Sequence, residues 1–321
     1  MCAIVSKDIK VAAEWLNKHE VVAIPTETVY GLAANIYDLI AVQKIYRVKN
    51  RPLNNPLIVH VADINQAINL VQSFPDAAVR LGKKFWPGPL TMVLSKRKTV
   101  PDLVTGSQDT VAIRVPDHPL TLALLEETGY PLAAPSANPF NYISPVTAKQ
   151  VDEMLGDKIP YILDGGRCGK GIESTIIGFE ENRVKLLREG AISREEIEET
   201  IGESLLSNLK KEVAHPGMFM KHYSPRTRVL LTDNINEAIK KYPGNKIALL
   251  LFSSRCSLVN ADQQVVLSPS GNLDEAARNL YDALHRLDAS SYDIIIAERI
   301  PDIGIGRAIN DRLNKAAHEK L

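Results

Sequence analysis

Two cations stand in the run KNRPLNNPLIVHV (49–61), which joins a predicted helix to a predicted strand. Lys49 and Arg51 have no acidic residue within this run to neutralise them. A lysine supplies a compact charge and an arginine a planar fork, and this combination suits a polyphosphate. The alternative is a solvated helix end whose cations complement the helix dipole. That alternative suits Lys44 and Arg47 better, because we expect the helix to end before Lys49.

The segment PTETVYGL (25–32) places three hydroxyl groups and one carboxylate directly after a predicted buried strand. Ligands of open α/β sheets bind at the carboxyl ends of strands, so Thr26, Glu27, Thr28 and Tyr30 are candidates for a site. The alternative is a turn whose threonines bond their own backbone. The local pattern favours neither interpretation.

Arg114 lies in RVPDHP (114–119), at the end of an otherwise apolar predicted strand. A cation on a buried strand face needs a carboxylate partner. That partner is either a structural side chain or the carboxylate of a substrate, and the sequence leaves both open.

Short polar side chains also follow a strand in PSANPFNYISP (135–145). Ser136, Asn138, Asn141 and Ser144 lie on a segment stiffened by prolines, and their hydroxyls and amides can donate to phosphate oxygens. The signal is weak by itself, because Ser-Asn-Pro runs are also common turns.

Several other sites are excluded by spacing. The glycine-rich segment DGGRCGKGIEST (164–175) is not a Walker A loop, because Ile172 stands where that motif needs lysine. The seven histidines are scattered without an H-E-x-x-H motif, so we expect no protein-held catalytic metal. No G-x-S-x-G elbow occurs either.

Composition limits the class of protein and its partners. Lys plus Arg and Asp plus Glu both total 38, so no strong direct binding of nucleic acid is expected. The longest apolar runs are too short for a bilayer, so no membrane association is expected. The three cysteines are far apart in the chain, which favours a reducing, cytoplasmic location.

Helical and strand periods alternate along the first half of the chain. Ser6 is a plausible N-cap for a helix with Ile9 and Leu16 on its buried face, and Asp63 can cap another helix. The expected strands are VVAIP (21–25), LIVHV (57–61), TMVLS (91–95), TVAIRV (110–115), YPLAAP (130–135), YILD (161–164), STIIGF (174–179) and VKLLRE (184–189). Several strands follow one another without a helix, which predicts a mixed sheet.

The pattern changes around residues 210–228, which have two prolines and no sustained period. A stretch of this length is a linker or a functional loop. After it, strands and helices alternate regularly, which predicts a small α/β domain with a largely parallel sheet. We therefore expect a domain over 5–192, a helix and linker over 193–228, and a C-terminal domain over 229–321.

Taken together, the motifs resemble the threonylcarbamoyl-adenylate synthase family in its two-domain Sua5 form. They are PTETVYGLAAN, the K-x-R of Lys49 and Arg51 with PLNNPLIVHV, WPGPLT, VAIRVPDHP, APSAN with the S-x-N of Ser136 and Asn138, and HPGMFMKHYSP. They occur in this order over residues 25–225. The last motif resembles the linker between the family's two domains, and we expect it to act as a lid.

The resemblance implies an α/β fold with a YrdC-like twisted mixed sheet around a large cavity, plus a smaller Rossmann-like C-terminal domain. It implies a nucleotidyltransferase that makes threonylcarbamoyl-AMP from L-threonine, bicarbonate and ATP, with release of pyrophosphate. Mg²⁺ would arrive with ATP rather than in a protein cage. A separate transferase complex would then move the product to a tRNA adenosine beside the anticodon.

The resemblance also implies roles for single residues. Lys49 and Arg51 are the candidate catalytic cations, since charge develops on the leaving pyrophosphate. The implied nucleotide-binding residues are Arg51, Asn55, Thr110, Ser136, Asn138, Ser144, Arg188 and Tyr223. The implied threonine-binding residues are Thr28, His60, Arg114, the backbone at Ala134, and Ser174. Two alternative functions are carbamoyl transfer to another acceptor and RNA binding without catalysis.

Overall fold

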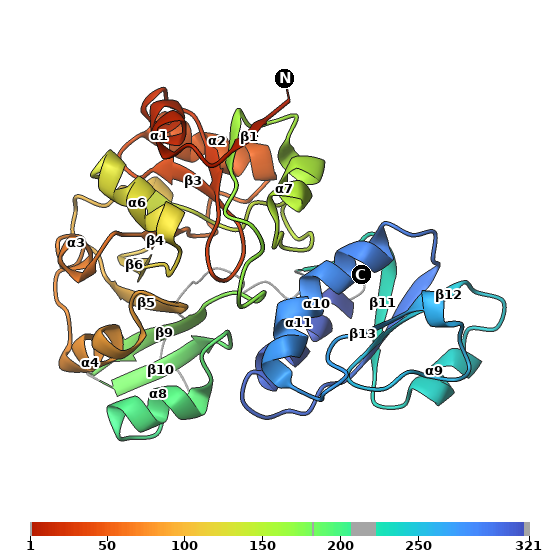
Figure 1. Ribbon diagram of the computed structural model, residues 1–321. Coiled ribbons are helices and arrows are strands. Elements are labelled where there is room, and N and C mark those ends of the chain that lie inside the picture. The colour runs from red at the N-terminus through yellow and green to blue at the C-terminus, as the bar shows by residue number, and fades with distance from the viewer. Residues whose placement is uncertain (1, 182, 207–222, 318–321) are drawn as a thin grey trace. The chain divides into compact units, whose positions relative to one another are not determined.

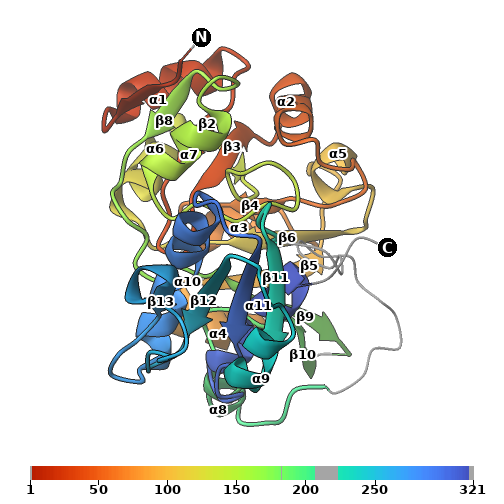
Figure 2. The same ribbon diagram turned by 90° about the vertical axis from the view of Figure 1, so that its right-hand side faces the viewer.

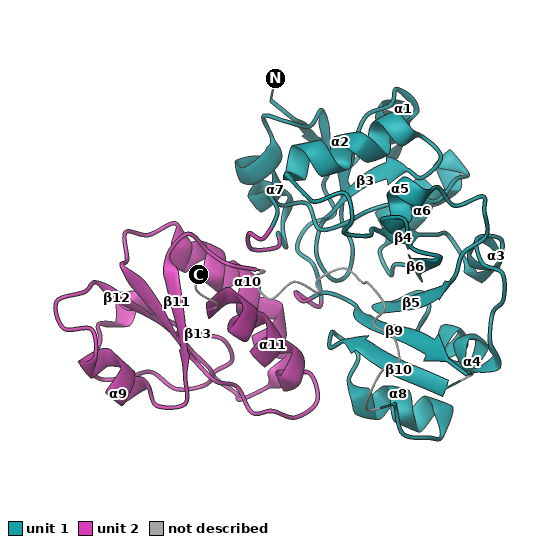
Figure 3. Cartoon of the chain, turned by 180° about the vertical axis from the view of Figure 1, so that it is seen from behind, with its two compact units in different colours: residues 1–140, 145–169, 173–218 teal, residues 141–144, 170–172, 219–321 magenta. Residues whose placement is uncertain are grey.

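A computed structural model describes residues 2–181, 183–206 and 223–317. The chain divides into two compact units, which we describe separately (Figure 3). Unit 1 comprises residues 1–140, 145–169 and 173–218, and unit 2 comprises residues 141–144, 170–172 and 219–321. The linker over 207–222, and with it most of the predicted lid, lies outside the described residues.

Unit 1 is built on a ten-stranded sheet in the order β1-β8-β2-β3-β7-β4-β6-β5-β9-β10 (Figure 1). Its strands are β1 (Ile4–Ser6), β2 (Val22–Ile24), β3 (Gly31–Asn35), β4 (Ile58–His60), β5 (Leu90–Ser95), β6 (Thr110–Arg114), β7 (Leu132–Ala133), β8 (Tyr161–Leu163), β9 (Thr175–Glu180) and β10 (Arg183–Arg188). Parallel pairs such as β4 with β6 alternate with antiparallel pairs such as β5 with β6. The predicted mixed sheet is confirmed.

Helices of unit 1 cover this sheet and connect its strands. They are α1 (Ile9–Asn17), α2 (Leu39–Lys49), α3 (Ile64–Ile68), α4 (Asp76–Phe85), α5 (Asp102–Thr105), α6 (Pro119–Thr128), α7 (Ala148–Leu155) and α8 (Arg194–Ile201). Apolar side chains of α1 and α6, such as Leu16 and Leu124, share one buried cluster with Val22 of β2 and Leu163 of β8. This packing fixes the strands that lead into the segment 25–30.

Two local predictions in unit 1 are wrong. The N-cap of α1 is Asp8, whose carboxylate accepts from the amides of Lys10 and Val11, while Ser6 ends β1. An aspartate adjacent to the helix can reach its free amides, which a more distant serine cannot. Helix α2 includes Lys49 and ends at Asn50, which takes the left-handed conformation. Lys49 therefore lies inside the helix, not beyond it, whereas Asp63 caps α3 as expected.

Unit 2 contains a parallel four-stranded sheet in the order β11-β14-β12-β13 (Figure 2). Its strands are β11 (Arg228–Thr232), β12 (Ile247–Leu251), β13 (Gln264–Val266) and β14 (Ile294–Glu298), and its helices are α9 (Ile235–Lys240), η1 (Ala261–Gln263), α10 (Leu273–Asp288) and α11 (Gly306–Ala317). Ala238 of α9 packs against Leu249 and Ile296 of the sheet. The predicted small parallel α/β domain is confirmed.

Two short segments that precede β9 in the chain, residues 141–144 and 170–172, belong to unit 2. Within 141–144, the Tyr142 hydroxyl donates to Asp288 of α10 at 2.5 Å, and the Ser144 carbonyl is 3.1 Å from His285 Nε2. These contacts place the segment in unit 2, although the chain on both sides of it belongs to unit 1. No helix among the described residues is long and apolar enough to cross a membrane.

Candidate functional site

The segment after β2 forms a turn through Thr26 and contacts Arg114 through Thr28. The Thr26 hydroxyl donates to the carbonyl of Val29 at 2.6 Å and accepts from the amides of Thr28 and Val29. Thr26 therefore stabilises the turn itself. Thr28 instead presents its hydroxyl to Arg114, whose Nη1 donates to it at 2.9 Å.

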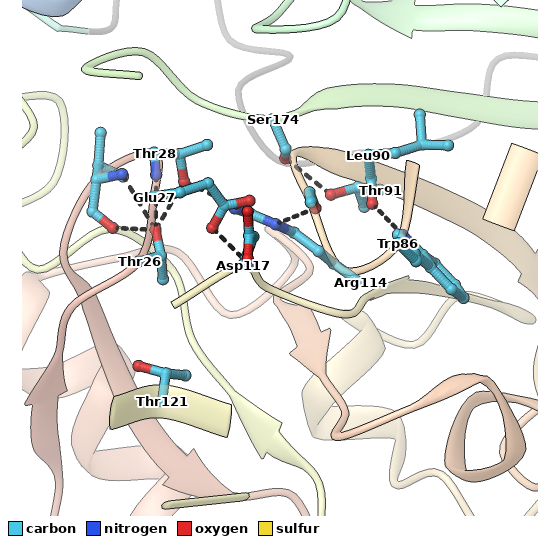
Figure 4. Close-up of polar contacts among 12 residues, drawn as sticks. Thr26, Glu27, Thr28, Trp86, Leu90, Thr91, Arg114, Asp117, Thr121 and Ser174 are labelled. Carbon is cyan, nitrogen blue, oxygen red and sulfur yellow. Dashed lines mark hydrogen bonds and ion pairs between the residues drawn. The ribbon is translucent and has the colours of Figure 1, made fainter. Parts of the chain in front are cut away.

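Arg114, the last residue of β6, is buried and held from three sides (Figure 4). Its Nε donates to the carbonyl of Gly88 at 3.2 Å and its Nη1 donates to Thr28. Its Nη2 lies 2.6 Å from Oε1 of Glu27. The carboxylate partner that the sequence requires is therefore a protein side chain. The sequence makes Glu27 a candidate through the PTETVYGL segment, but the resemblance implies no role for it.

His60 ends β4 and is the register partner of Arg114 on the neighbouring parallel strand. The imidazole is buried, and its Nδ1 has no hydrogen-bond partner among the described residues. Burial, and then the charge of Arg114, lower the pKa of His60 to about 3. His60 is therefore neutral at neutral pH, and it can donate or accept a hydrogen bond without adding charge.

Ser174 contacts the side chains of Thr91 and Arg188. The Ser174 hydroxyl is 2.8 Å from the hydroxyl of Thr91 and accepts from Nη2 of Arg188 at 3.1 Å. Arg188 Nη2 also donates to the Ser174 carbonyl at 2.8 Å. The predicted threonine residue Ser174 and the predicted nucleotide residue Arg188 are thus in direct contact. The amide of Ala134 donates to the carbonyl of Ile58, which places Ala134 beside β4.

Lys49 is fully buried, and its side chain links the end of α2 to the S-x-N loop by hydrogen bonds. Its Nζ donates to the carbonyls of Ser136 and Asn138, both at 2.5 Å. Burial, and then the charge of Arg51, lower the pKa of Lys49 well below its usual value. Two predicted nucleotide residues, Ser136 and Asn138, therefore contact this lysine through their carbonyls. An ammonium has three donors, so the charged form retains one for another partner.

Arg51 and Asn55 form a compact unit in the loop after α2. Arg51 Nη2 donates to Oδ1 of Asn55 at 2.6 Å and to the carbonyl of Pro56 at 2.7 Å. Arg51 also lines a pocket of about 490 Å³ with residues of α2, including Arg47. Thr110, at the start of β6, lines a different pocket of about 250 Å³.

The two remaining predicted residues, Ser144 and Tyr223, belong to unit 2. The Tyr223 ring is buried and stacks on Tyr281, with ring centroids 5.7 Å apart, and the Arg312 guanidinium lies 5.2 Å from its centroid. Among the described residues, no three His, Cys, Asp or Glu side chains gather as metal ligands.

Comparison with known proteins assigns both halves of the chain. Residues 14–190 match the Sua5/YciO/YrdC family, whose profile is described as telomere recombination, and residues 192–318 match the threonylcarbamoyl-AMP synthase C-terminal domain. The chain is 43% identical to the threonylcarbamoyl-AMP synthase of Bacillus subtilis, over 95% of this chain and 92% of the relative. It is 40% identical to the enzyme of that name from Pyrococcus abyssi, over 98% and 95% of the two chains.

A solved structure is similar over the same extent. The crystal structure of P. abyssi Sua5 complexed with L-threonine covers 98% of both chains with a TM-score of 0.89 and 38% identity. The similarity therefore includes both units and is not restricted to one motif.

Proposed function

Because the chain belongs to the threonylcarbamoyl-AMP synthase family in its two-domain Sua5 form, we propose that it condenses L-threonine, bicarbonate and ATP into threonylcarbamoyl-AMP and releases pyrophosphate. The observation that carries the proposal is the buried, immobilised guanidinium of Arg114 in a chain that matches synthases along nearly its whole length. The names of these relatives favour synthesis over carbamoyl transfer to another acceptor and over RNA binding without catalysis.

In this proposal, the threonine site is formed by Thr28, His60, Arg114, the backbone at Ala134, and Ser174. Arg114 receives the carboxylate of threonine, because an arginine fork matches a carboxylate in two parallel hydrogen bonds. Its fixed position supports this role, since a guanidinium held by Gly88 and Thr28 has little rotamer freedom to lose on binding. The neutral His60 beside it does not compete for the anion.

The nucleotide site would use Arg51, Asn55, Thr110, Ser136, Asn138, Ser144, Arg188 and Tyr223, with Mg²⁺ arriving on ATP. Threonine carbamate attacks the α-phosphorus, and negative charge develops on the leaving pyrophosphate. Lys49 and Arg51 stabilise that charge as fixed cations. A triphosphate near Lys49 would also favour its charged form, which burial disfavours.

The product passes to a tRNA threonylcarbamoyl transferase complex in the cytoplasm, which modifies the adenosine beside the anticodon.

The test is pyrophosphate release with ATP, bicarbonate and each amino acid in turn. Release should require threonine and bicarbonate together. Serine lacks one methyl group, and a fitted apolar pocket discriminates by about 1–3 kcal/mol for such a difference. Some turnover of serine is therefore compatible with the proposal, whereas equal release without any amino acid contradicts it.

A further inference from the structure

Glu27 and Arg114 form a buried ion pair, but the two facing atoms are not aligned as a hydrogen bond. Glu27 Oε1 and Arg114 Nη2 are 2.6 Å apart and buried. Neither atom has a hydrogen bond of acceptable geometry among the described residues. One buried acceptor and one buried donor therefore sit side by side, each lacking an aligned partner.

Both groups are also held in place by other hydrogen bonds. Oε2 of Glu27 accepts from the amide of Asp117 at 3.0 Å, which fixes the carboxylate (Figure 4). Arg114 is fixed by Gly88 through Nε and by Thr28 through Nη1. Unsatisfied buried polar atoms destabilise a fold, so a pair that is held in this state is a candidate for ligand binding.

The pair has the complementary charges of an α-amino acid. Nη2 offers a donor to an anion, and Oε1 offers an acceptor to a cation a short distance away. A zwitterion carries its carboxylate and its ammonium on the same carbon, so one molecule can engage both atoms. Building on the proposed function, we propose that Glu27 Oε1 binds the α-ammonium group of the amino acid whose carboxylate Arg114 holds.

This contact would make Glu27 a specificity residue. A hydroxy acid or a simple carboxylic acid satisfies Arg114 but gives Oε1 of Glu27 no aligned hydrogen-bond donor. A site built for a donor rejects an analogue that lacks it, because the buried acceptor is then unpaired. The competing explanation is that Glu27 only neutralises Arg114 and never contacts the ligand.

Calorimetry on the full-length chain separates these explanations with two ligands, L-threonine and 3-hydroxybutanoate, which is threonine without its amino group. The wild-type chain should prefer threonine, and Glu27→Gln should reduce that preference about 10- to 100-fold, the range of one charge-assisted hydrogen bond. Asp117→Asn is the matched control, because Asp117 is exposed and reaches Glu27 only through its backbone amide. It should keep the wild-type preference.

An unchanged preference in Glu27→Gln, with both affinities reduced equally, would overturn the role of Glu27 in binding the ammonium. If Glu27→Gln does not fold, the wild-type chain still decides, because equal affinity for the two ligands overturns the proposal and a preference for threonine supports it. A wild-type chain that binds no threonine contradicts the proposed function itself, so the two failures are distinguishable.

Discussion

At the residue scale, the protein itself fixes the orientation of Arg114. Its side chain is positioned by a carbonyl from the WPGP turn and by a hydroxyl from the turn after β2, so its orientation does not depend on a ligand. The sequence predicts that Arg114 needs a carboxylate partner, because the strand around it is apolar. It cannot identify Glu27 as that partner, because the two residues are far apart in the chain and meet only through tertiary packing.

The role of Arg114 can be tested by replacement with lysine. Arg114→Lys keeps the charge but loses the planar fork, so threonine binding should weaken by about 1–3 kcal/mol while ATP binding changes little. Titration calorimetry with each ligand measures both effects. Equal losses for the two ligands would instead indicate that Arg114 only maintains the fold.

His60 makes a prediction for the pH dependence of stability. Its pKa is about 3 in the folded chain, whereas an unfolded histidine titrates near 6.5. Below that value only the unfolded chain binds the proton, so this stabilisation is present above about pH 6.5 and is lost as pH falls toward 3. Between pH 7 and pH 5 the loss should be about 2 kcal/mol.

Thermal unfolding at these two pH values checks the prediction. His60→Gln should show a smaller decrease in melting temperature than the wild-type chain, because glutamine does not titrate. A wild-type response in His60→Gln would mean that another group titrates.

At the scale of elements, Lys49 joins a helix to a loop, and this contact predicts a loss of turnover. Lys49→Met keeps an unbranched side chain of similar size but removes both hydrogen bonds to the loop of Ser136 and Asn138. A displacement of about 1 Å in a positioning group can reduce a rate about 10²-fold, and we expect a loss of that size in pyrophosphate release.

The matched control is Lys44→Met on the same helix. Lys44 is half-buried and pairs with Glu20 at 2.6 Å, away from the S-x-N loop. Its replacement should leave the rate near that of the wild-type chain. Equal effects of the two substitutions would assign them to the stability of α2 rather than to the loop.

Periodicity predicts elements better where they are long than where they are short. The stripe of Leu280 and Leu284 identifies α10 correctly, because a sixteen-residue helix repeats its pattern over several turns. Strand β3 was not predicted, because GLAAN is apolar throughout and has no alternation. The end of α2 was placed too early, because cap geometry at Asn50 is not visible in the sequence.

For the whole molecule, the order of motifs predicts two α/β parts but not how residues are shared between them. The segments 141–144 and 170–172 belong to unit 2 by contact, although the chain on both sides of each belongs to unit 1. Side-chain contacts such as the one between Tyr142 and Asp288 place these segments in unit 2. A local sequence pattern cannot predict a contact between residues so far apart in the chain. The boundary at residue 192 stays a prediction.

This division predicts the behaviour of a chain that ends at Leu206. All five residues proposed for threonine belong to unit 1, and so does the core of α1, α6 and the large sheet. The shortened chain should therefore fold and bind threonine with nearly the affinity of the full-length chain. It lacks Tyr223, and Ser144 loses its contact with His285, so threonylcarbamoyl-AMP formation should fall at least about 10²-fold.

Calorimetry with threonine, circular dichroism and pyrophosphate release measure these outcomes, and full-length Tyr223→Ala shows how much of the loss is due to one side chain. A folded, shortened chain that makes the adenylate at the full-length rate would show that neither the linker nor unit 2 is needed for the chemistry.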